Sequence, residues 1–173
     1  MYDDDDLQRL YGKKYFSHRT RPEMWNRRAQ FVLEKFNPKT ALDIGCASGE
    51  FVKSMIDVNI DAYGIDGSDF AISNSNESIK NKILKVNLNS DPFPFENNTF
   101  DFIGSFYSVE HIHDIEFFSK ELFRTLKSSG KAWFLTPNIG EEGRTKVDVF
   151  TNTFENWKSI FEKQNFIVTK FSP

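Results

Sequence analysis

The sequence contains a single cysteine, no long apolar run and no excess of positive charge, and each absence excludes a class of protein. Cys46 alone can neither close an intramolecular disulfide nor join a zinc-binding cysteine cluster, so we expect a reducing, cytoplasmic setting. No apolar stretch approaches the roughly 20 residues of a membrane-spanning helix. The net charge of -3, from 22 basic and 25 acidic residues, gives no general attraction to nucleic acid or anionic membranes.

The residues that are present indicate a globular domain. Hydrophobic residues make up 39% of the chain and charged residues 27%, and 19 phenylalanines supply large apolar side chains for a core. A length of 173 residues suits one domain of the common size, about 100 to 150 residues, with a short extension. We expect the domain over residues 39–173 and the extension, which includes a helix, over residues 1–38.

Apolar segments with strand and helix periodicity alternate along the chain. The predicted strands cover residues 41–44, 62–65, 83–86, 100–106, 132–135 and 166–171. The predicted helices cover about 22–36, 50–57, 69–80, 115 to a stop at Gly130, and a segment around Trp157. Such alternation predicts an α/β fold with right-handed crossovers, a mostly parallel, doubly wound sheet and helices on both faces. Ligands bind such sheets beyond the carboxyl ends of the strands, where the strand order reverses.

Residues 40–51 are typical of a ligand-binding turn, because an apolar strand runs into an acidic, glycine-rich turn and then into a helix. Gly45 and Gly49 permit backbone angles and close approaches that a side chain would forbid. The strand at 62–65 ends in Asp66, which follows Asp43 at close to the spacing of roughly 20 residues at which a carboxylate meets the ribose of a nucleotide-like cofactor. The two carboxylates are expected at neighbouring strand ends.

Several short segments of the chain match the motifs of one known family in order and spacing. They are residues 41–49 (ALDIGCASG), 64–68 (GIDGS), 92–95 (PFPF), 98–101 (NTFD), 109–111 (VEH), 126–131 (LKSSGK) and 136–138 (TPN). Over about residues 39–170 the chain resembles the class I S-adenosylmethionine-dependent methyltransferases, in particular the branch with ubiquinone-biosynthesis and many small-molecule methyltransferases. The resemblance implies a Rossmann-like sheet and S-adenosylmethionine as cofactor.

The family sheet has seven strands, of which the last is antiparallel, whereas this sequence offers six. The seventh strand is therefore expected to be missing or truncated. An open sheet edge could then be covered by the N-terminal segment, by a second copy in a dimer, or by a partner chain.

The resemblance also assigns cofactor-binding residues. Asp43 would face the methionine end of the cofactor, Asp66 the ribose and Asn87 the adenine amino group, although strand-end aspartates also serve as helix caps or turn residues. The full set of expected cofactor-binding residues is Asp43, Gly45, Cys46, Ala47, Gly49, Asp66, Gly67, Ser68, Asn87, Leu88 and Ser105.

Tyr107 and His111 are the candidate catalytic residues, since both follow the strand at 100–106 on the expected acceptor side. Imidazole titrates near neutral pH, so His111 is the candidate general base, against a structural role in orienting its loop. Tyr11 and Tyr15 are candidates for a lid, against aromatic packing on the sheet edge. No metal site is expected.

The resemblance favours methyl transfer to a small-molecule acceptor such as a sugar, lipid or other metabolite. The alternatives are a catalytically silent S-adenosylmethionine-binding subunit that needs a partner, a protein or RNA methyltransferase, and a dinucleotide-dependent oxidoreductase. The oxidoreductase lacks support because residues 45–49 contain no Gly-x-Gly-x-x-Gly run. Arginines 19, 21, 27 and 28 form a basic cluster that could meet an acidic substrate. Neither a large nucleic acid nor a membrane is an expected partner.

Overall fold

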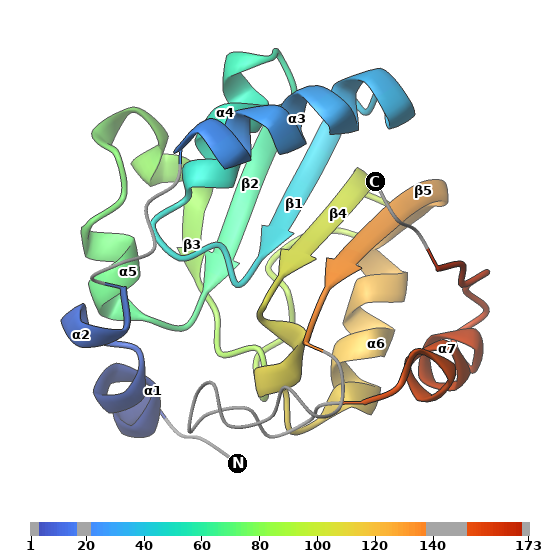
Figure 1. The fold of residues 1–173 in the computed structure, drawn as a ribbon. Helices are drawn as coiled ribbons and strands as arrows, with labels where there is room; N and C mark the ends of the chain where they lie inside the picture. Colours follow the sequence, from blue (N-terminus) through green and yellow to red (C-terminus); the bar gives the residue numbers. More distant parts are fainter. Residues whose placement is uncertain (1–3, 17–21, 138–151, 171–173) are drawn as a thin grey trace.

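A computed structural model describes residues 4–16, 22–137 and 152–170 of the chain, and its centre is a parallel five-stranded sheet (Figure 1). The strand order is β3-β2-β1-β4-β5, so the chain reverses direction across the sheet after β3 and returns on the other side of β1. The strands are β1 (Thr40–Ile44), β2 (Asp61–Asp66), β3 (Ile83–Lys85), β4 (Phe100–Phe106) and β5 (Leu126–Leu135).

Helices lie on both faces of this sheet. Figure 1 shows α3 and α4 together over one face and α6 behind the other, with α1 and α2 beside the β3 side of the sheet. The helices are α1 (Asp4–Leu10), α2 (Lys13–Phe16), α3 (Pro22–Phe36), α4 (Glu50–Asp57), α5 (Asp69–Ser73), α6 (Ile115–Thr125) and α7 (Phe154–Glu162), with 3₁₀ turns η1 (Glu77–Lys82) and η2 (Val109–His111). The arrangement confirms the predicted α/β class.

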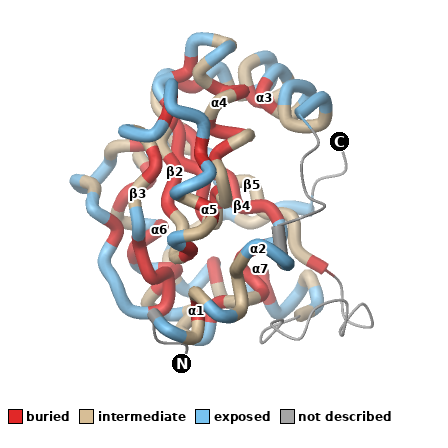
Figure 2. Tube along the Cα trace, turned by 90° about the vertical axis from the view of Figure 1, so that its left-hand side faces the viewer, coloured by how far each residue is buried: buried red, intermediate tan, exposed pale blue. Residues whose placement is uncertain are grey.

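The sheet buries both of its faces because successive side chains of each strand point in opposite directions. Ala41 and Phe102 pack on the α3 and α4 side, whereas Leu42 and Ile103 pack on the side of α6 and α7. The central strands β1 and β4 are accordingly almost entirely buried (Figure 2). Two apolar layers thus hold the ends of the strands rigidly in place.

Three sequence predictions were wrong. The helix predicted over 69–80 is interrupted, because Asn74 donates a side-chain bond to the Phe70 carbonyl (2.7 Å) and Asn76 accepts one from the Ser78 N–H (2.9 Å). Such local side-chain bonds compete with helix propagation. Strand β5 begins at Leu126, so Gly130 lies within a strand and does not end the preceding helix.

The third correction concerns the predicted strand at 166–171, of which residue 171 lies outside the described residues. Residues 166–170 form no strand. Phe166 instead folds back on α7, with its N–H donating to the carbonyl of Phe161 (3.4 Å) and the two rings 6.0 Å apart. The sheet has five parallel strands in the described part of the chain.

Candidate functional site

A pocket opens at the carboxyl ends of β1, β2 and β4, at the point where the strand order reverses. Its walls come from the turn after β1, the turn after β2, the start of the β3–β4 connection, the loop after β4, and helices α1, α3 and α4. The lining residues are Leu7, Tyr11, Trp25, Asp43, Gly45, Cys46, Ala47, Ser48, Glu50, Phe51, Asp66, Gly67, Ser68, Asn87, Leu88, Asn89, Phe106, Tyr107, Ser108, His111 and Ile112.

The turn after β1 is tight because glycine and alanine adopt left-handed backbone angles there. Gly45 has a φ of 69° and Ala47 a φ of 51°. A methyl group on Gly45 would lie 1.9 Å from the Oγ of Ser108, so only glycine lets the turn pack against the loop after β4. The N–H groups of Gly45 and Cys46 both donate to the carbonyl of Ile65, at 2.9 and 3.1 Å. The turn is thereby tied to β2.

Asp66 joins the same turn to the end of β2. Its carboxylate accepts bonds of 2.8 Å from the N–H groups of Ala47 and Ser68, and a further bond from that of Gly67. An ionised carboxylate has about four acceptor positions, so one remains for a ligand hydroxyl in the pocket. Burial nevertheless raises the pKa of Asp66 above its ordinary value, while these three bonds act in the opposite direction.

Asp43 is buried at the end of β1, with 4% of its surface exposed. Burial raises its pKa well above the ordinary 3.8, and the neighbouring carboxylates of Asp66 and Glu50 raise it further. Arg28 acts in the opposite direction. A group of acidic side chains at one buried position favours a cationic ligand, because a positive charge would offset both the desolvation and the mutual repulsion.

Arg28 does not line the pocket itself but places a positive charge behind two of its lining residues. Its guanidinium lies 4.7 Å from the ring centre of Trp25 and 4.8 Å from that of Phe106, both of which line the pocket. Its Nη1 atom is buried and has no hydrogen-bond partner. Burial lowers the pKa of Arg28, while the charges of Tyr107 and Asp43 raise it. An unpaired buried N–H of this kind favours an anionic ligand group.

The opposite end of the pocket is formed by the residues after β3. The Oδ1 of Asn87 accepts from the N–H of Asn89 (3.1 Å), and the Oδ1 of Asn89 accepts from the N–H of His113 (2.6 Å). Leu88 adds a buried apolar surface. Asn87 and Leu88 thus present an amide group and an apolar surface at this end of the pocket.

Tyr107 and His111 line the side of the pocket that follows β4. Tyr107 is 47% exposed, has a φ of 57° and donates its N–H to the Leu135 carbonyl (2.7 Å). The ring of His111 lies 5.6 Å from that of Tyr11, which α1 brings over the pocket. The two candidate catalytic residues therefore lie on one wall, next to Tyr11.

The structure brings nearly all of the residues expected at the site into one pocket. Gly49 and Ser105 lie just behind it: Gly49 precedes α4 as its N-cap, and the hydroxyl of Ser105 donates to the carbonyl of Ile44 (3.0 Å). The side chain of Tyr15, a lid candidate, lies outside the described residues. Within residues 4–16, 22–137 and 152–170, no cluster of three metal-ligating side chains occurs.

Sequence reasoning missed several lining residues, which are Leu7, Trp25, Ser48, Glu50, Phe51, Asn89, Ser108 and Ile112. Leu7 and Trp25 reach the pocket from helices that precede the motif-bearing segment. No spacing rule relates those helices to the motifs. The only available signal was the amphipathic pattern of α3, which predicts a buried face but not what the face contacts.

The family comparison agrees with this geometry. The model of a family described as a methyltransferase domain matches residues 16–171. The chain therefore belongs to this family, within the class I S-adenosylmethionine-dependent methyltransferases, whose cofactor is S-adenosylmethionine.

Among curated proteins, the chain is 33% identical over 99 residues to a ubiquinone biosynthesis O-methyltransferase of Pelagibacter ubique, a match that covers 56% of this chain and 41% of that protein. The first three such relatives are covered over 41%, 48% and 43% of their own lengths, so the chain spans less than half of each.

Two solved structures share the fold at low identity. A phosphoethanolamine N-methyltransferase 2 of Haemonchus contortus, in complex with phosphomonomethylethanolamine and S-adenosylhomocysteine, has a TM-score of 0.73 and 20% identity, and covers 96% of this chain and 45% of its own. A Haloferax volcanii methyltransferase in complex with the activator Trm112 has a TM-score of 0.67 and 16% identity, with coverage of 88% and 79%. No helix in the described ranges has the length and apolar character to cross a membrane.

Proposed function

We propose that the protein transfers the methyl group of S-adenosylmethionine to a small-molecule acceptor such as a sugar, lipid or other metabolite. The observation that carries this proposal is the convergence of Asp43, Asp66 and the turn at Gly45 on one pocket. Methyltransferase family membership supports the reaction class. The name of the Pelagibacter relative, a ubiquinone biosynthesis enzyme, supports an acceptor of small-molecule size.

The side chains in the pocket fit the charges of this cofactor. Asp43 would hold the ammonium group, since burial among carboxylates favours a cation there. Arg28, which lies behind the lining residues Trp25 and Phe106, would attract the carboxylate through its buried Nη1, which has no hydrogen-bond partner. Asp66 would accept a ribose hydroxyl, and Asn87 and Leu88 would meet the adenine ring. Gly67 and Ser68 would follow the ribose edge, and Cys46, Ala47, Gly49 and Ser105 would shape the turns around it.

The bound cofactor supplies an activated methyl group on a sulfonium, so the protein has chiefly to place the acceptor. Proximity and orientation can supply about 7 to 11 kcal/mol of barrier lowering. Tyr107 and His111 are proposed to meet the acceptor from the wall that follows β4. His111 would remove a proton where the acceptor must lose one, and Tyr107 would orient the acceptor through its hydroxyl.

Within the extension formed by residues 1–38, α1 and Tyr11 are proposed to act as a lid over the domain formed by residues 39–173, whereas α3 packs on the sheet. Gln8 of α1 donates to the carbonyl of Gly67 (2.9 Å) and accepts from the N–H of Asp69 (2.7 Å). The hydroxyl of Ser68 donates to the carbonyl of Tyr11 (2.6 Å). These bonds hold the lid to the turn that would contact the ribose, and a closed lid keeps water from the reacting groups.

A second candidate is a binding subunit that becomes active only with a partner. The Haloferax structure, a methyltransferase in complex with an activator, favours this candidate. Incubating the protein with S-adenosylmethionine and a panel of quinol, sterol and sugar acceptors, and measuring S-adenosylhomocysteine, separates the two. Turnover on a small molecule by the protein alone supports the first candidate, while binding without turnover over the panel supports the second.

A further inference from the structure

We propose that Glu121 and Arg124 of α6 are positioning residues that set the adenine-side wall of the pocket, formed by Asn87, Leu88 and Asn89. The inference rests on the proposed function, because it assumes that an adenosyl group occupies this end of the pocket. Neither Glu121 nor Arg124 lines the pocket, so any effect on the ligand must pass through the chain between them and the wall.

The wall begins a connection that has no regular secondary structure. Residues 86–99, between β3 and β4, belong to no helix or strand, so their backbone groups depend on side chains and turns for partners. Two bonds hold the start of the segment: the Val86 N–H donates to the Asp66 carbonyl (3.0 Å), and the His113 N–H donates to Asn89 (2.6 Å). The rest of the segment has to be fixed by contacts to other elements.

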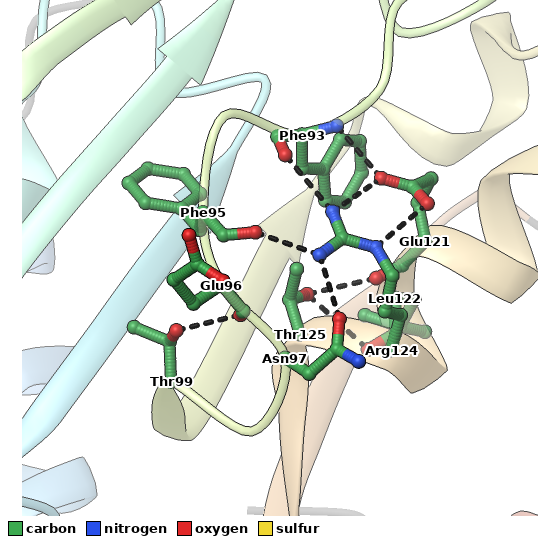
Figure 3. Close-up of polar contacts among 9 residues, drawn as sticks. All are labelled: Phe93, Phe95, Glu96, Asn97, Thr99, Glu121, Leu122, Arg124 and Thr125. Atoms are coloured by element: carbon green, nitrogen blue, oxygen red, sulfur yellow. Dashed lines mark hydrogen bonds and ion pairs between the residues drawn. The ribbon is translucent and has the colours of Figure 1, made fainter.

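Arg124 fixes the far half of this connection, as Figure 3 shows. Its Nη2 donates to the carbonyl of Phe93 (2.9 Å), and its Nη1 donates to the carbonyl of Phe95 (2.7 Å) and to the Oδ1 of Asn97 (3.1 Å). One planar guanidinium therefore holds three points of the loop in fixed relation, which the single ammonium of a lysine could not reproduce.

Glu121 binds the same loop beside Arg124, and together the two side chains form what we call the Glu121–Arg124 clamp. Its Oε2 accepts from the N–H of Phe93 (2.8 Å), and both of its oxygens accept from Arg124, at 2.9 and 2.7 Å. The N–H and the carbonyl of Phe93 are thus both bound to one ion pair. The ring of Phe93 is buried and contacts that of Phe118, at 6.0 Å between centres, so its side chain is fixed as well.

The clamp reaches the wall through only one intervening residue. Asp91 closes a turn with Asn87, in which the N–H of Asn87 donates to Asp91 (2.9 Å) and that of Asp91 donates to the Asn87 carbonyl (2.8 Å). Pro92 alone separates this turn from Phe93, and its ring restricts the backbone between them. A displacement of Phe93 therefore moves the turn that carries Asn87.

The test compares R124K, R124M and the control variant K120M. Lys120 lies on the same helix and pairs with Glu116 at 2.7 Å on the exposed surface, so its loss removes a charge without touching the loop. Each protein is titrated with S-adenosylhomocysteine and with S-inosylhomocysteine, which lacks the adenine amino group. The ratio of the two dissociation constants reports how well the wall recognises adenine.

The wild-type protein and K120M are expected to prefer the adenosyl ligand by the same ratio. R124K should reduce this ratio by about threefold or more and R124M should reduce it further, the scale of one misplaced hydrogen bond. The value of kcat at saturating cofactor should change less than KM for the cofactor. If R124M fails to fold, R124K alone carries the comparison.

An R124K protein that is less stable but keeps the wild-type ratio would contradict the inference, because the clamp would then serve stability alone. A wild-type protein that binds neither ligand would contradict the proposed function, and this inference with it. The two failures are therefore distinguishable by the wild-type titration.

Discussion

The carboxylate of Asp66 accepts a 2.8 Å hydrogen bond from the backbone N–H of Ala47, which joins the turn after β1 to the end of β2. The same carboxylate faces the pocket. One side chain therefore shapes the glycine-rich turn and presents an acceptor to the ligand, so a change at Asp66 should disturb both.

The variant D66N is expected to bind S-adenosylhomocysteine at least about tenfold more weakly, because an amide loses the charge and has only one acceptor oxygen. Calorimetric titration measures the change. D61N is the matched control: Asp61 begins the same strand and pairs with Lys82 on the surface, at 2.7 Å. Equal affinity of D66N and the wild-type protein would contradict the assignment of Asp66.

Asp43 is expected to destabilise the ligand-free protein near neutral pH, although its carboxylate is proposed to bind the ammonium group of the cofactor. Its pKa is raised above 3.8 in the folded state, so the folded state holds a proton that the unfolded state releases. The contribution of Asp43 to the free energy of unfolding is therefore most favourable at low pH, where the carboxyl is protonated. This contribution is lost as the pH rises from 3.8 through the raised pKa.

The variant D43N has no carboxylate to ionise, so its stability should not fall in this pH range. Near neutral pH its ligand-free melting temperature should exceed that of the wild-type protein, by about 2 to 4 °C for each kcal/mol of difference in the free energy of unfolding. Its affinity for S-adenosylmethionine should fall at the same time. Thermal melts between pH 5 and pH 8 measure the first effect. A ligand-free D43N protein that melts below the wild-type protein at pH 7 would contradict the argument.

Arg28 should matter for the amino-acid part of the cofactor and not for its adenosine. In R28M, affinity for S-adenosylhomocysteine is expected to fall by about tenfold or more, the loss of one charged hydrogen bond. Affinity for 5'-methylthioadenosine, which lacks the carboxylate, should stay within about twofold, provided that the aromatic neighbours keep their places. The exposed neighbour Arg27 supplies the control variant R27M. Parallel losses for both ligands in R28M would contradict carboxylate recognition.

The bonds of Gln8 to the turn after β2 should slow the release of the ligand. Q8A removes the bonds to Gly67 and Asp69, and we expect the dissociation rate of S-adenosylhomocysteine to rise by about three- to tenfold. Stopped-flow displacement measures this rate. R9A is the control, since Arg9 lies on the exposed surface of the same helix, where it pairs with Asp6 at 2.6 Å. Identical rates in Q8A and R9A would show that α1 does not act as a lid.

The sequence was sufficient to predict the elements in which the apolar pattern and the residues at the ends indicate the same bounds. The strand at 100–106 and the helix at 22–36 lie where predicted, because the first is rich in phenylalanine and isoleucine and the second begins at Pro22 with a regular apolar stripe. The helix predicted over 69–80 begins at Asp69 as expected, but it ends at Ser73 because asparagine side chains bind the local backbone and divide the segment. Gly130 resembles a helix stop, but Thr125 already ends α6.

The pocket was predictable only where the residues follow strands. Asp43, Asp66 and Asn87 each stand at a strand end, so the parallel sheet alone brings them together. Leu7 and Trp25 line the pocket from helices that precede the sheet, and their positions depend on tertiary packing that no local pattern specifies. The Glu121–Arg124 clamp could not be predicted for the same reason, since its loop partners lie 27 to 31 residues away in the sequence.

The most direct test of the central claim is a calorimetric titration of the wild-type protein with S-adenosylmethionine, S-adenosylhomocysteine and NAD. The account predicts one site that binds the first two ligands and does not bind NAD. Binding of NAD alone, or no binding of either adenosyl ligand at millimolar concentration, would contradict it.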